Sequence, residues 1–143
     1  MSNELMRKEV NEAIQAAERA LVCLREAKEQ LRKARNWGYA DLLGGGFLIN
    51  MMKRSRMADA SRCMEEAKHA LAVLQMELRD VQVPMDMRLE INGFMDFADF
   101  FFDGLIADWF AQDKINKAAH QVDDAIRRVE DIRTDLKGLN FYY

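Results

Sequence analysis

Apolar residues recur along much of this chain at alternating steps of three and four, the spacing that places side chains on one face of a helix. Three stretches carry this pattern: residues 3–35, 57–81 and 115–139. The core positions of the first stretch are Val10, Ala13, Ala17, Ala20, Leu24, Ala27, Leu31 and Ala34. We therefore predict three long amphipathic helices with coiled-coil packing, the first of which ends near residues 36–38.

Residues 36–55 interrupt the heptads with an aromatic residue, an acid and three consecutive glycines. Asp41 is of the residue type that caps or begins a helix, and a short apolar helix would follow it over residues 42–52. The heptad frame breaks at residues 53–56, where Ser55 could cap the next helix. We predict a short apolar helix that is separate from the long helix after it.

A period of two replaces the helical period over residues 81–91, and Pro84 forbids a continuing helix. We predict an extended segment near residues 82–92 that runs back along the preceding helix. A new helix that starts at Pro84 is the alternative. A second short apolar helix is expected to begin near Phe94 and to break at Asp113, and the last long helix should end at Lys137-Gly138.

Residues 39–81 align with residues 97–139 without a gap. Ala40-Asp41 falls on Ala98-Asp99, Gly46 falls on Gly104, and the heptad positions coincide. This alignment predicts an internal duplication. The three glycines at 44–46 would leave room for the phenylalanine rings of the second unit.

Together these patterns predict one all-α domain over residues 1–143, an elongated helical bundle with coiled-coil packing and two short apolar helices. Half of the residues are apolar and 31% are charged, which is typical of a globular chain. The net charge of −3 disfavours nucleic acid as a partner. The first half is net positive and the second net negative, which predicts attraction between the halves or a bipolar surface. No leader of signal-peptide type and no membrane-spanning run is found, so we expect a cytoplasmic protein.

Several acids lie among phenylalanines, where a charge is costly unless it is paired or solvated. Asp41, Asp99 and Asp103 are the candidates for a cation or small-ligand site, but caps and salt bridges are the favoured interpretation. A catalytic acid–base pair has the least support, because no nucleophile, neighbouring histidine or phosphate-binding loop accompanies these acids. We expect no catalytic residue, no bound metal and no cofactor.

The histidines and cysteines are interpreted as structural or surface residues. Glu66 and His69 have the spacing used by di-iron carboxylate bundles, but the heptad frame places both on the outer face and no second such motif exists. Cys23 and Cys63 are far apart in sequence and outside any metal-binding spacing, so we interpret them as reduced packing residues.

A local basic group follows the first apolar stretch, formed by Lys53, Arg54 and Arg56. A solvated surface is the favoured interpretation. Contact with an anionic membrane surface is the alternative, because the apolar residues 42–52 adjoin the group.

The stretch from Trp37 to Ala60 resembles an uncharacterised family of small bacterial helical proteins. The shared features are Trp37-Gly38, Asp41, Leu43 to Gly46, and Lys53 with Ser55, and a second, aromatic block runs from Phe97 to Leu105. The resemblance implies an all-helical cytoplasmic protein. The motif positions are Trp37, Gly38, Asp41, Gly44, Gly45, Gly46, Ser55, Asp99 and Gly104. The resemblance implies no activity and no functional residue.

We predict a non-enzymatic structural or protein–protein interaction module that binds a protein partner or a second copy of itself. The alternative is a peripheral regulator that binds a small ligand, a cation or an anionic membrane at the end of the bundle that carries the glycines and aromatic residues.

Overall fold

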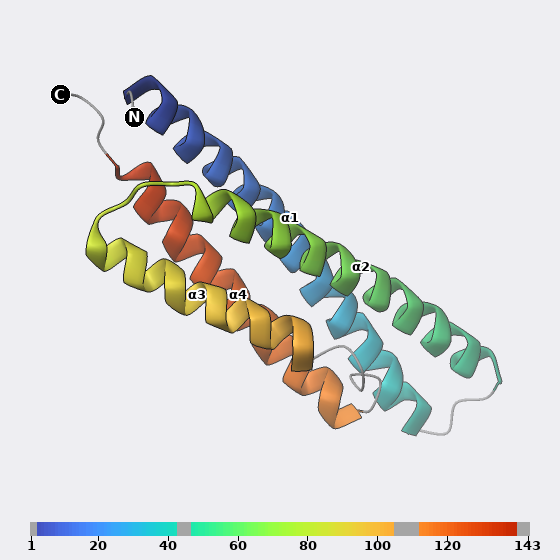
Figure 1. The fold of residues 1–143 in the computed structure, drawn as a ribbon. Coiled ribbons are helices and arrows are strands. Elements are labelled where there is room, and N and C mark those ends of the chain that lie inside the picture. The colour runs from blue at the N-terminus through green and yellow to red at the C-terminus, as the bar shows by residue number, and fades with distance from the viewer. Residues whose placement is uncertain (1–2, 43–46, 105–111, 140–143) are drawn as a thin grey trace.

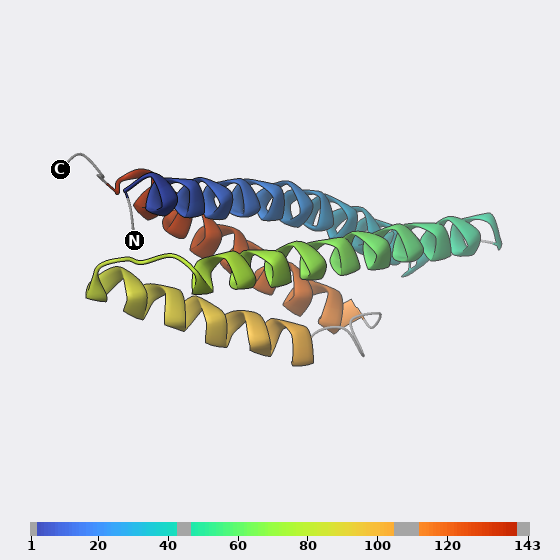
Figure 2. The same cartoon turned by 45° about the horizontal axis from the view of Figure 1, so that its top comes forward.

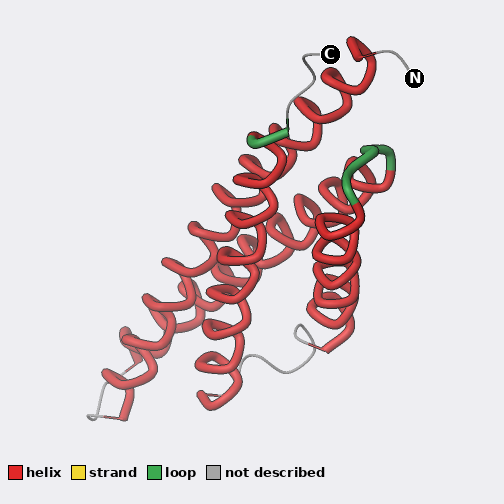
Figure 3. The backbone as a smooth tube through the Cα atoms, turned by 90° about the vertical axis from the view of Figure 1, so that its left-hand side faces the viewer, coloured by secondary structure: helices red, strands yellow, loops and turns green. Residues whose placement is uncertain are grey.

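The computed structural model describes the backbone of residues 3–42, 47–104 and 112–139, and the side chains of residues 4–35, 58–99 and 115–139. This part of the chain forms four α-helices and no strand: α1 (Asn3–Leu42), α2 (Phe47–Arg79), α3 (Met85–Gly104) and α4 (Gln112–Lys137). Apart from the loop between α2 and α3 and the residues after α4, the described chain is helical (Figure 3). The predicted all-α helical bundle is confirmed.

Successive helices run in opposite directions along an elongated bundle (Figure 1). α1 packs along both α2 and α4, and α3 lies across from α1, against α2 and α4 (Figure 2). α1 begins and α4 ends at the same end of the bundle. None of the described helices combines the length and the apolar character needed to cross a membrane.

The core is built from the heptad positions that the sequence indicates. The eight core positions predicted for α1 are all buried. The same holds for the described positions of the second and third heptad runs, namely Ala60, Met64, Ala67, Leu71, Leu74, Leu78, Val81, Ile115, Ala118, Val122, Ala125, Val129, Ile132 and Leu136. Leu139 is partly buried against this cluster, and the side chain of Met57 lies outside the described residues. Burial therefore follows the helical period that the sequence predicts.

Side-chain size differs between the two sides of the bundle. The buried side chains of α1 are mostly alanines, which let a neighbouring backbone approach closely. The buried face of α3 carries the larger Met87, Ile91 and Phe94. α3 accordingly approaches its neighbours less closely than α1 approaches α2 and α4.

Ion pairs cross the seam between α1 and α4. Arg25 pairs with Glu130 at 3.1 Å, and Lys28 pairs with Asp123 at 2.7 Å. The Glu18 carboxylate accepts a hydrogen bond from the Arg133 guanidinium at 3.2 Å. Because these side chains are largely exposed, each pair contributes little to stability. The pairs of Arg25 and Lys28 have the polarity predicted for the two halves of the chain, whereas that of Glu18 has the opposite polarity.

The first helix is longer than predicted. α1 continues through Trp37 and Gly38 to Leu42, so the expected end near residues 36–38 is wrong. A single glycine costs a helix only about 1 kcal/mol, which the packing of a long helix readily offsets. Asp41 is the next-to-last residue of α1 and therefore does not begin a helix.

α2 is continuous across the predicted break at residues 53–56, so the first short apolar helix is not a separate element. Ser55 lies inside α2 and is not a cap. The physical reason is that a shift of heptad frame rotates the buried stripe but leaves the backbone hydrogen bonds of the helix intact. Neither proline nor glycine occurs between Phe47 and Arg79 to break them.

The extended segment predicted near residues 82–92 is wrong, and the alternative of a helix starting at Pro84 is right. α3 begins at Met85, and the Arg88 amide donates to the Pro84 carbonyl at 2.9 Å. Met85 and Leu89 are 74% and 64% exposed, whereas Met87, Ile91, Phe94 and Ala98 are buried at helical spacing. The alternating pattern arose because apolar side chains occupy both faces of the first turns of α3. The second short apolar helix is likewise wrong, because residues 94–104 continue α3.

Two side chains of the α2–α3 hairpin donate hydrogen bonds to backbone carbonyls, and one of them also donates to a carboxylate. The Arg88 guanidinium donates to the carbonyls of Leu78 (3.3 Å) and Val81, at the end of α2 where carbonyls lack helical partners. Gln75 is buried and donates to the Met95 carbonyl at 3.4 Å and to Asp99 at 3.2 Å. These polar contacts supplement the looser apolar packing of α3.

The last helix ends where the sequence predicts. α4 ends at Lys137, and the Gly138 amide donates to the carbonyls of Thr134 (3.1 Å) and Asp135 (3.2 Å). α2 ends at Arg79, the position that the predicted repeat aligns with Lys137. The duplication and the coiled-coil packing themselves stay predictions.

Enlarging a buried alanine of α1 should destabilise the bundle. Ala20→Leu adds three carbon atoms where the side chain is fully buried, and overpacking of this kind costs about 1–3 kcal/mol. Ala58→Leu is the matched control on an exposed position of α2 and should change stability by less than about 0.5 kcal/mol. Urea unfolding followed by circular dichroism measures both. Equal effects of the two variants would contradict the close packing of α1.

Removing the charged donor at the α2–α3 turn should also destabilise the protein. Arg88→Met keeps the length of the side chain but leaves the two carbonyls without their donor, at a cost of about 1.5–3 kcal/mol. Arg127→Met is the control, because its exposed side chain pairs with Asp124 of the same helix. The midpoint of thermal unfolding compares the two variants, and an unchanged midpoint for Arg88→Met would show that the contact is not needed.

Candidate functional site

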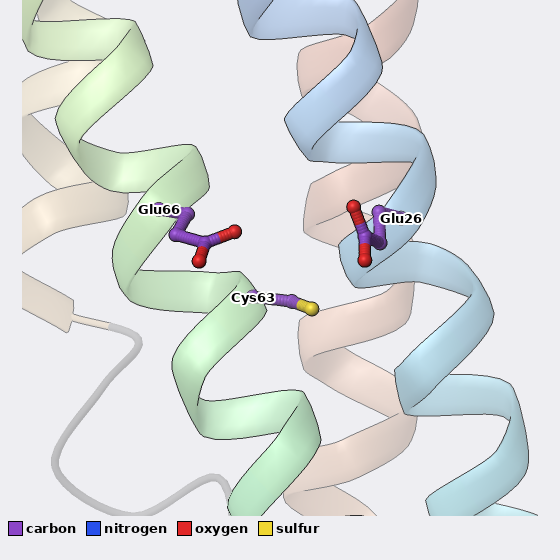
Figure 4. A group of neighbouring side chains, drawn as sticks. All are labelled: Glu26, Cys63 and Glu66. Carbon is purple, nitrogen blue, oxygen red and sulfur yellow. The ribbon is translucent and has the colours of Figure 1, made fainter.

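Thiol and carboxylate side chains meet on the seam between α1 and α2. The ligand atoms of Glu26, Cys63 and Glu66 all lie within 4.8 Å of one another (Figure 4). Glu26 projects from α1, and the other two project from neighbouring turns of α2 toward it. Cys63 is buried, whereas both glutamates are exposed.

The register of the α1–α2 hairpin explains this meeting. Glu26 lies as far before the last residue of α1 as Cys63 lies after the first residue of α2. Cys23 and Glu66 are likewise equally far from the same two helix ends. Two antiparallel helices joined by a short connection bring residues at equal distances from it side by side, so each cysteine faces a glutamate.

The electrostatics of the cluster act on both thiols. Burial raises the pKa of Cys63, and the charges of Glu26 and Glu66 raise it further. Burial also raises the pKa of Cys23, with the same two glutamates adding to it. Both thiols are therefore protonated at neutral pH in the ion-free protein, which makes them poor nucleophiles.

A pocket of about 490 Å³ adjoins the cluster along the same seam. Its lining residues are Ala16, Arg19, Cys23, Arg62, Glu65, Glu66, His69, Ala70 and Val73. The alanines and the valine give it apolar walls, and two arginines stand among its polar groups. Arg19 lowers the pKa of Cys23 and Arg62 lowers that of Cys63, against the stronger causes that raise both.

The seam between α3 and α4 is acidic. A hydrogen bond with Asp135 raises the pKa of Glu90 to about 7, and desolvation and the charges of Asp135, Asp131 and Asp86 add to the shift. Glu90 is thus protonated in part at neutral pH and donates to the Asp135 carboxylate. A separate pocket of about 220 Å³ between α1 and α4 is lined mostly by charged residues, and there a hydrogen bond from Arg32 lowers the pKa of Glu29.

Positive charge partly balances this acidic seam. Arg127 and Arg128 line a small pocket of about 200 Å³ together with Glu90 and Asp131. Arg128 also stacks over the Phe97 ring, with 4.7 Å from its guanidinium carbon to the ring centroid. Its pairing with Asp124, at 3.7 Å, lies within α4.

Few of the acids and motif residues predicted from sequence can be located in detail. Asp99 is exposed, and its carboxylate accepts a hydrogen bond from Gln75 at 3.2 Å. The side chains of Asp41 and Asp103 lie outside the described residues, so a cation site between Asp41 and Asp99 stays a prediction. The other motif and basic side chains outside the described residues are those of Trp37, Lys53, Arg54, Ser55 and Arg56. The predicted glycine packing at 44–46 also lies outside them, while Gly38 lies within α1 and Gly104 ends α3.

The interpretation of the histidines by heptad position is confirmed. Glu66, His69 and His120 are all exposed, as the heptad frame predicts. Both cysteines are free, also as predicted. Their interpretation as packing residues alone missed the glutamates beside them.

A repeated sequence signal marks the cluster. Cys23-Leu24-Arg25-Glu26 and Cys63-Met64-Glu65-Glu66 both place a glutamate three positions after a cysteine, on the same face of a helix. Had residues 43–46 been taken as the centre of a helical hairpin, the two motifs would have been placed opposite each other.

The outward face of α3 presents large apolar side chains to solvent. Met85 and Leu89 are one helical turn apart and are the most exposed large hydrophobic residues of the described chain. Gly93 continues this face by one more turn, and no atom lies within 4 Å of where its Cβ would stand. Met85, Leu89 and the open position at Gly93 thus form an apolar stripe on the outward face of α3.

Comparison with known proteins identifies no relative of this chain. No family model matches it. No curated protein and no solved structure matches it either. The resemblance to a family of small bacterial helical proteins stays a prediction.

Replacing Glu90 should stabilise the protein at alkaline pH. A carboxyl group whose pKa rises from 4.5 in the unfolded chain to about 7 in the folded protein stabilises the fold at low pH. That stability is lost as pH rises toward and through 7. Glu90→Gln keeps the hydrogen-bond donor without the charge, so its advantage over the wild type should grow between pH 5 and pH 8. The gain should stay below about 1 kcal/mol, because water screens charges on exposed side chains.

Urea unfolding at the two pH values measures this difference. Glu65→Gln, an exposed glutamate of α2, is the control and should show no pH-dependent gain. A gain for Glu90→Gln that is the same at pH 5 and pH 8 would contradict the raised pKa.

Proposed function

We propose that this chain is a non-enzymatic interaction module that binds a protein partner or a second copy of itself through the outward face of α3. The supporting observation is the exposure of Met85 and Leu89, 74% and 64%, on one face of a helix. Fully burying a side chain of this size is worth about 1.5–3 kcal/mol. A partner that covers both side chains removes their apolar surface from water, which stabilises the complex.

The neighbours of this apolar stripe narrow the chemistry of the partner. Asp86, Asp96 and Asp99 are exposed on α3, and the described part of this helix is net negative. A complementary surface therefore has an apolar centre with basic groups around it. The first half of the chain is itself net positive, so a second copy is one source of such groups.

The absence of a side chain at Gly93 supports a helical partner. Because its Cβ position faces open space, another helix could approach the backbone of α3 closely there. Apolar contacts at spacing i and i+4, followed by a small residue, are the features that a helix-on-helix contact uses.

The proposal includes a cytoplasmic location. Two free cysteines and no disulfide within the described residues are the usual state of thiols in a reducing compartment. The alternative role, a peripheral regulator that acts at the end carrying the glycines and aromatic residues, involves residues whose side chains are not described and stays a prediction.

The proposal predicts that polar substitutions on α3 reduce association without unfolding the chain. Met85→Gln/Leu89→Gln replaces the stripe by good helix formers, and the first turn of α3 gains no positive charge. In light scattering we expect a wild-type oligomer and a smaller mass for the double variant at the same concentration. Circular dichroism should show equal helix content.

Val22→Gln is the matched control, because Val22 is 62% exposed but lies on α1. It should leave the mass unchanged. A wild-type chain that is monomeric at every concentration would contradict self-association. Equal loss of mass in the control would show that α3 is not the contact face.

A further inference from the structure

The cluster on the α1–α2 seam has the composition of a metal site. Glu26, Cys63 and Glu66 bring one thiol and two carboxylates within 4.8 Å of one another, and they come from two different helices. The charges of both glutamates also act on Cys23, which faces Glu66 across the seam and lines the adjoining pocket. Cys23 is not one of the three residues within 4.8 Å, but it lies beside them on the same seam.

The arrangement is nearly symmetric. Each helix contributes a cysteine and, three positions later, a glutamate. Because the two helices run antiparallel, the two pairs run in opposite directions along the seam. Each thiol consequently faces a carboxylate of the other helix. Four donors arranged as two crossed pairs are suited to the tetrahedral coordination that zinc prefers.

We propose that Cys23, Glu26, Cys63 and Glu66 bind one divalent ion of the zinc class and thereby clamp α1 to α2. This site is independent of the proposed contact face on α3, because none of its ligands comes from that helix. Loss of one function would leave the other measurable.

The donor set selects the class of ion. Thiolate ligands favour zinc and chemically similar borderline ions over magnesium and calcium, which take oxygen ligands. Ligand atoms around a tetrahedral zinc lie roughly 3.3–3.8 Å apart, given metal–ligand bonds of about 2.0–2.3 Å. The separations among Glu26, Cys63 and Glu66, within 4.8 Å, need a contraction of about 1 Å, which rotation of the two exposed glutamate side chains supplies. Cys23 lies outside this group of three, so it must turn toward the ion to become the fourth ligand.

The charges around the site also fit a divalent ion. With both thiols ionised, the four ligands carry four negative charges. Arg19 and Arg62 stand beside the cysteines and supply two positive charges, and the ion supplies the other two. The arginines therefore balance a loaded site, although each alone would repel a cation.

The shape of the site limits what the ion does there. Cys63 is buried in the seam, and all four ligands are provided by rigid helices rather than by loops. Four protein ligands leave no open coordination position for a substrate, which is typical of a structural ion rather than a catalytic one. The chemical role is to cross-link the hairpin.

Titration of the reduced full-length chain with Co²⁺ and then Zn²⁺ tests the proposal. In the presence of a non-thiol reductant, we expect a thiolate-to-cobalt charge-transfer band of the intensity of two sulfur ligands, with tetrahedral ligand-field bands that Zn²⁺ abolishes. Zn²⁺ should also raise the midpoint of thermal unfolding. The absence of a charge-transfer band in the wild type would overturn the site.

Variants then test each ligand. Removal of a group that only supports a ligand lowers metal affinity by about 10–100-fold, so loss of a ligand itself should cost at least about tenfold. Cys23→Ser, Cys63→Ser and Glu66→Gln should each show this loss, and each cysteine variant should also halve the charge-transfer intensity. Because Glu66 is exposed, the Glu66→Gln variant should fold like the wild type in the absence of the ion.

Glu65→Gln is the matched control, since Glu65 adjoins Glu66 and lines the same pocket but is not one of the ligands. Its Zn²⁺ affinity should equal that of the wild type. An equal loss in this control would show that general negative charge attracts the ion, and unchanged intensity in Cys23→Ser would overturn the four-ligand site. Light scattering of the same samples distinguishes failure of the metal site from failure of the contact face on α3. Loss of metal binding should leave the mass of the particles unchanged.

Discussion

The close approach of α1 to α2 and α4 is the constraint on which the rest of the bundle depends. Most of the buried positions of α1 are alanines, which bring its backbone near two neighbours at once. Larger side chains from the partners, such as Leu71 and Ile132, then fill the remaining space. Because α1 is in contact with two helices, a local defect such as Gly38 does not end it.

That close approach also determines what lies at the edges of the seam. Residues that flank the buried stripe of α1 are brought within reach of those that flank the stripe of α2. On one side this places Glu26 beside Cys63 and Glu66. On the side toward α4 it places Arg25 beside Glu130 and Lys28 beside Asp123. The same packing therefore produces neutralised ion pairs on one seam and a cluster of potential metal ligands on the other.

α3 is held by different interactions. Its buried face consists of large side chains, and polar contacts from Arg88 and Gln75 supplement them. The acidic group around Glu90 makes its contact with α4 sensitive to pH. A helix that is held less closely and carries an apolar outer stripe is well suited to meet a partner, whereas the α1–α2 hairpin is well suited to hold a fixed constellation of ligands.

The heptad positions of the core can be assigned from the sequence, whereas the contacts between side chains of different helices depend on the tertiary structure. The heptad positions from Val10 to Leu136 could be read directly, because the helical period depends only on the residues of one helix. The helix limits between residues 36 and 56 were predicted wrongly, because neither a single glycine nor a shift of heptad frame breaks the backbone hydrogen bonds of a helix. The period of two at residues 81–91 was misleading because Met85 and Leu89 are apolar but face outward. Cys23 and Cys63 lie on different helices, and no spacing within either helix shows that each faces a glutamate of the other. Periodicity along one helix contains no information about that register, which is set by the packing of two helices against each other.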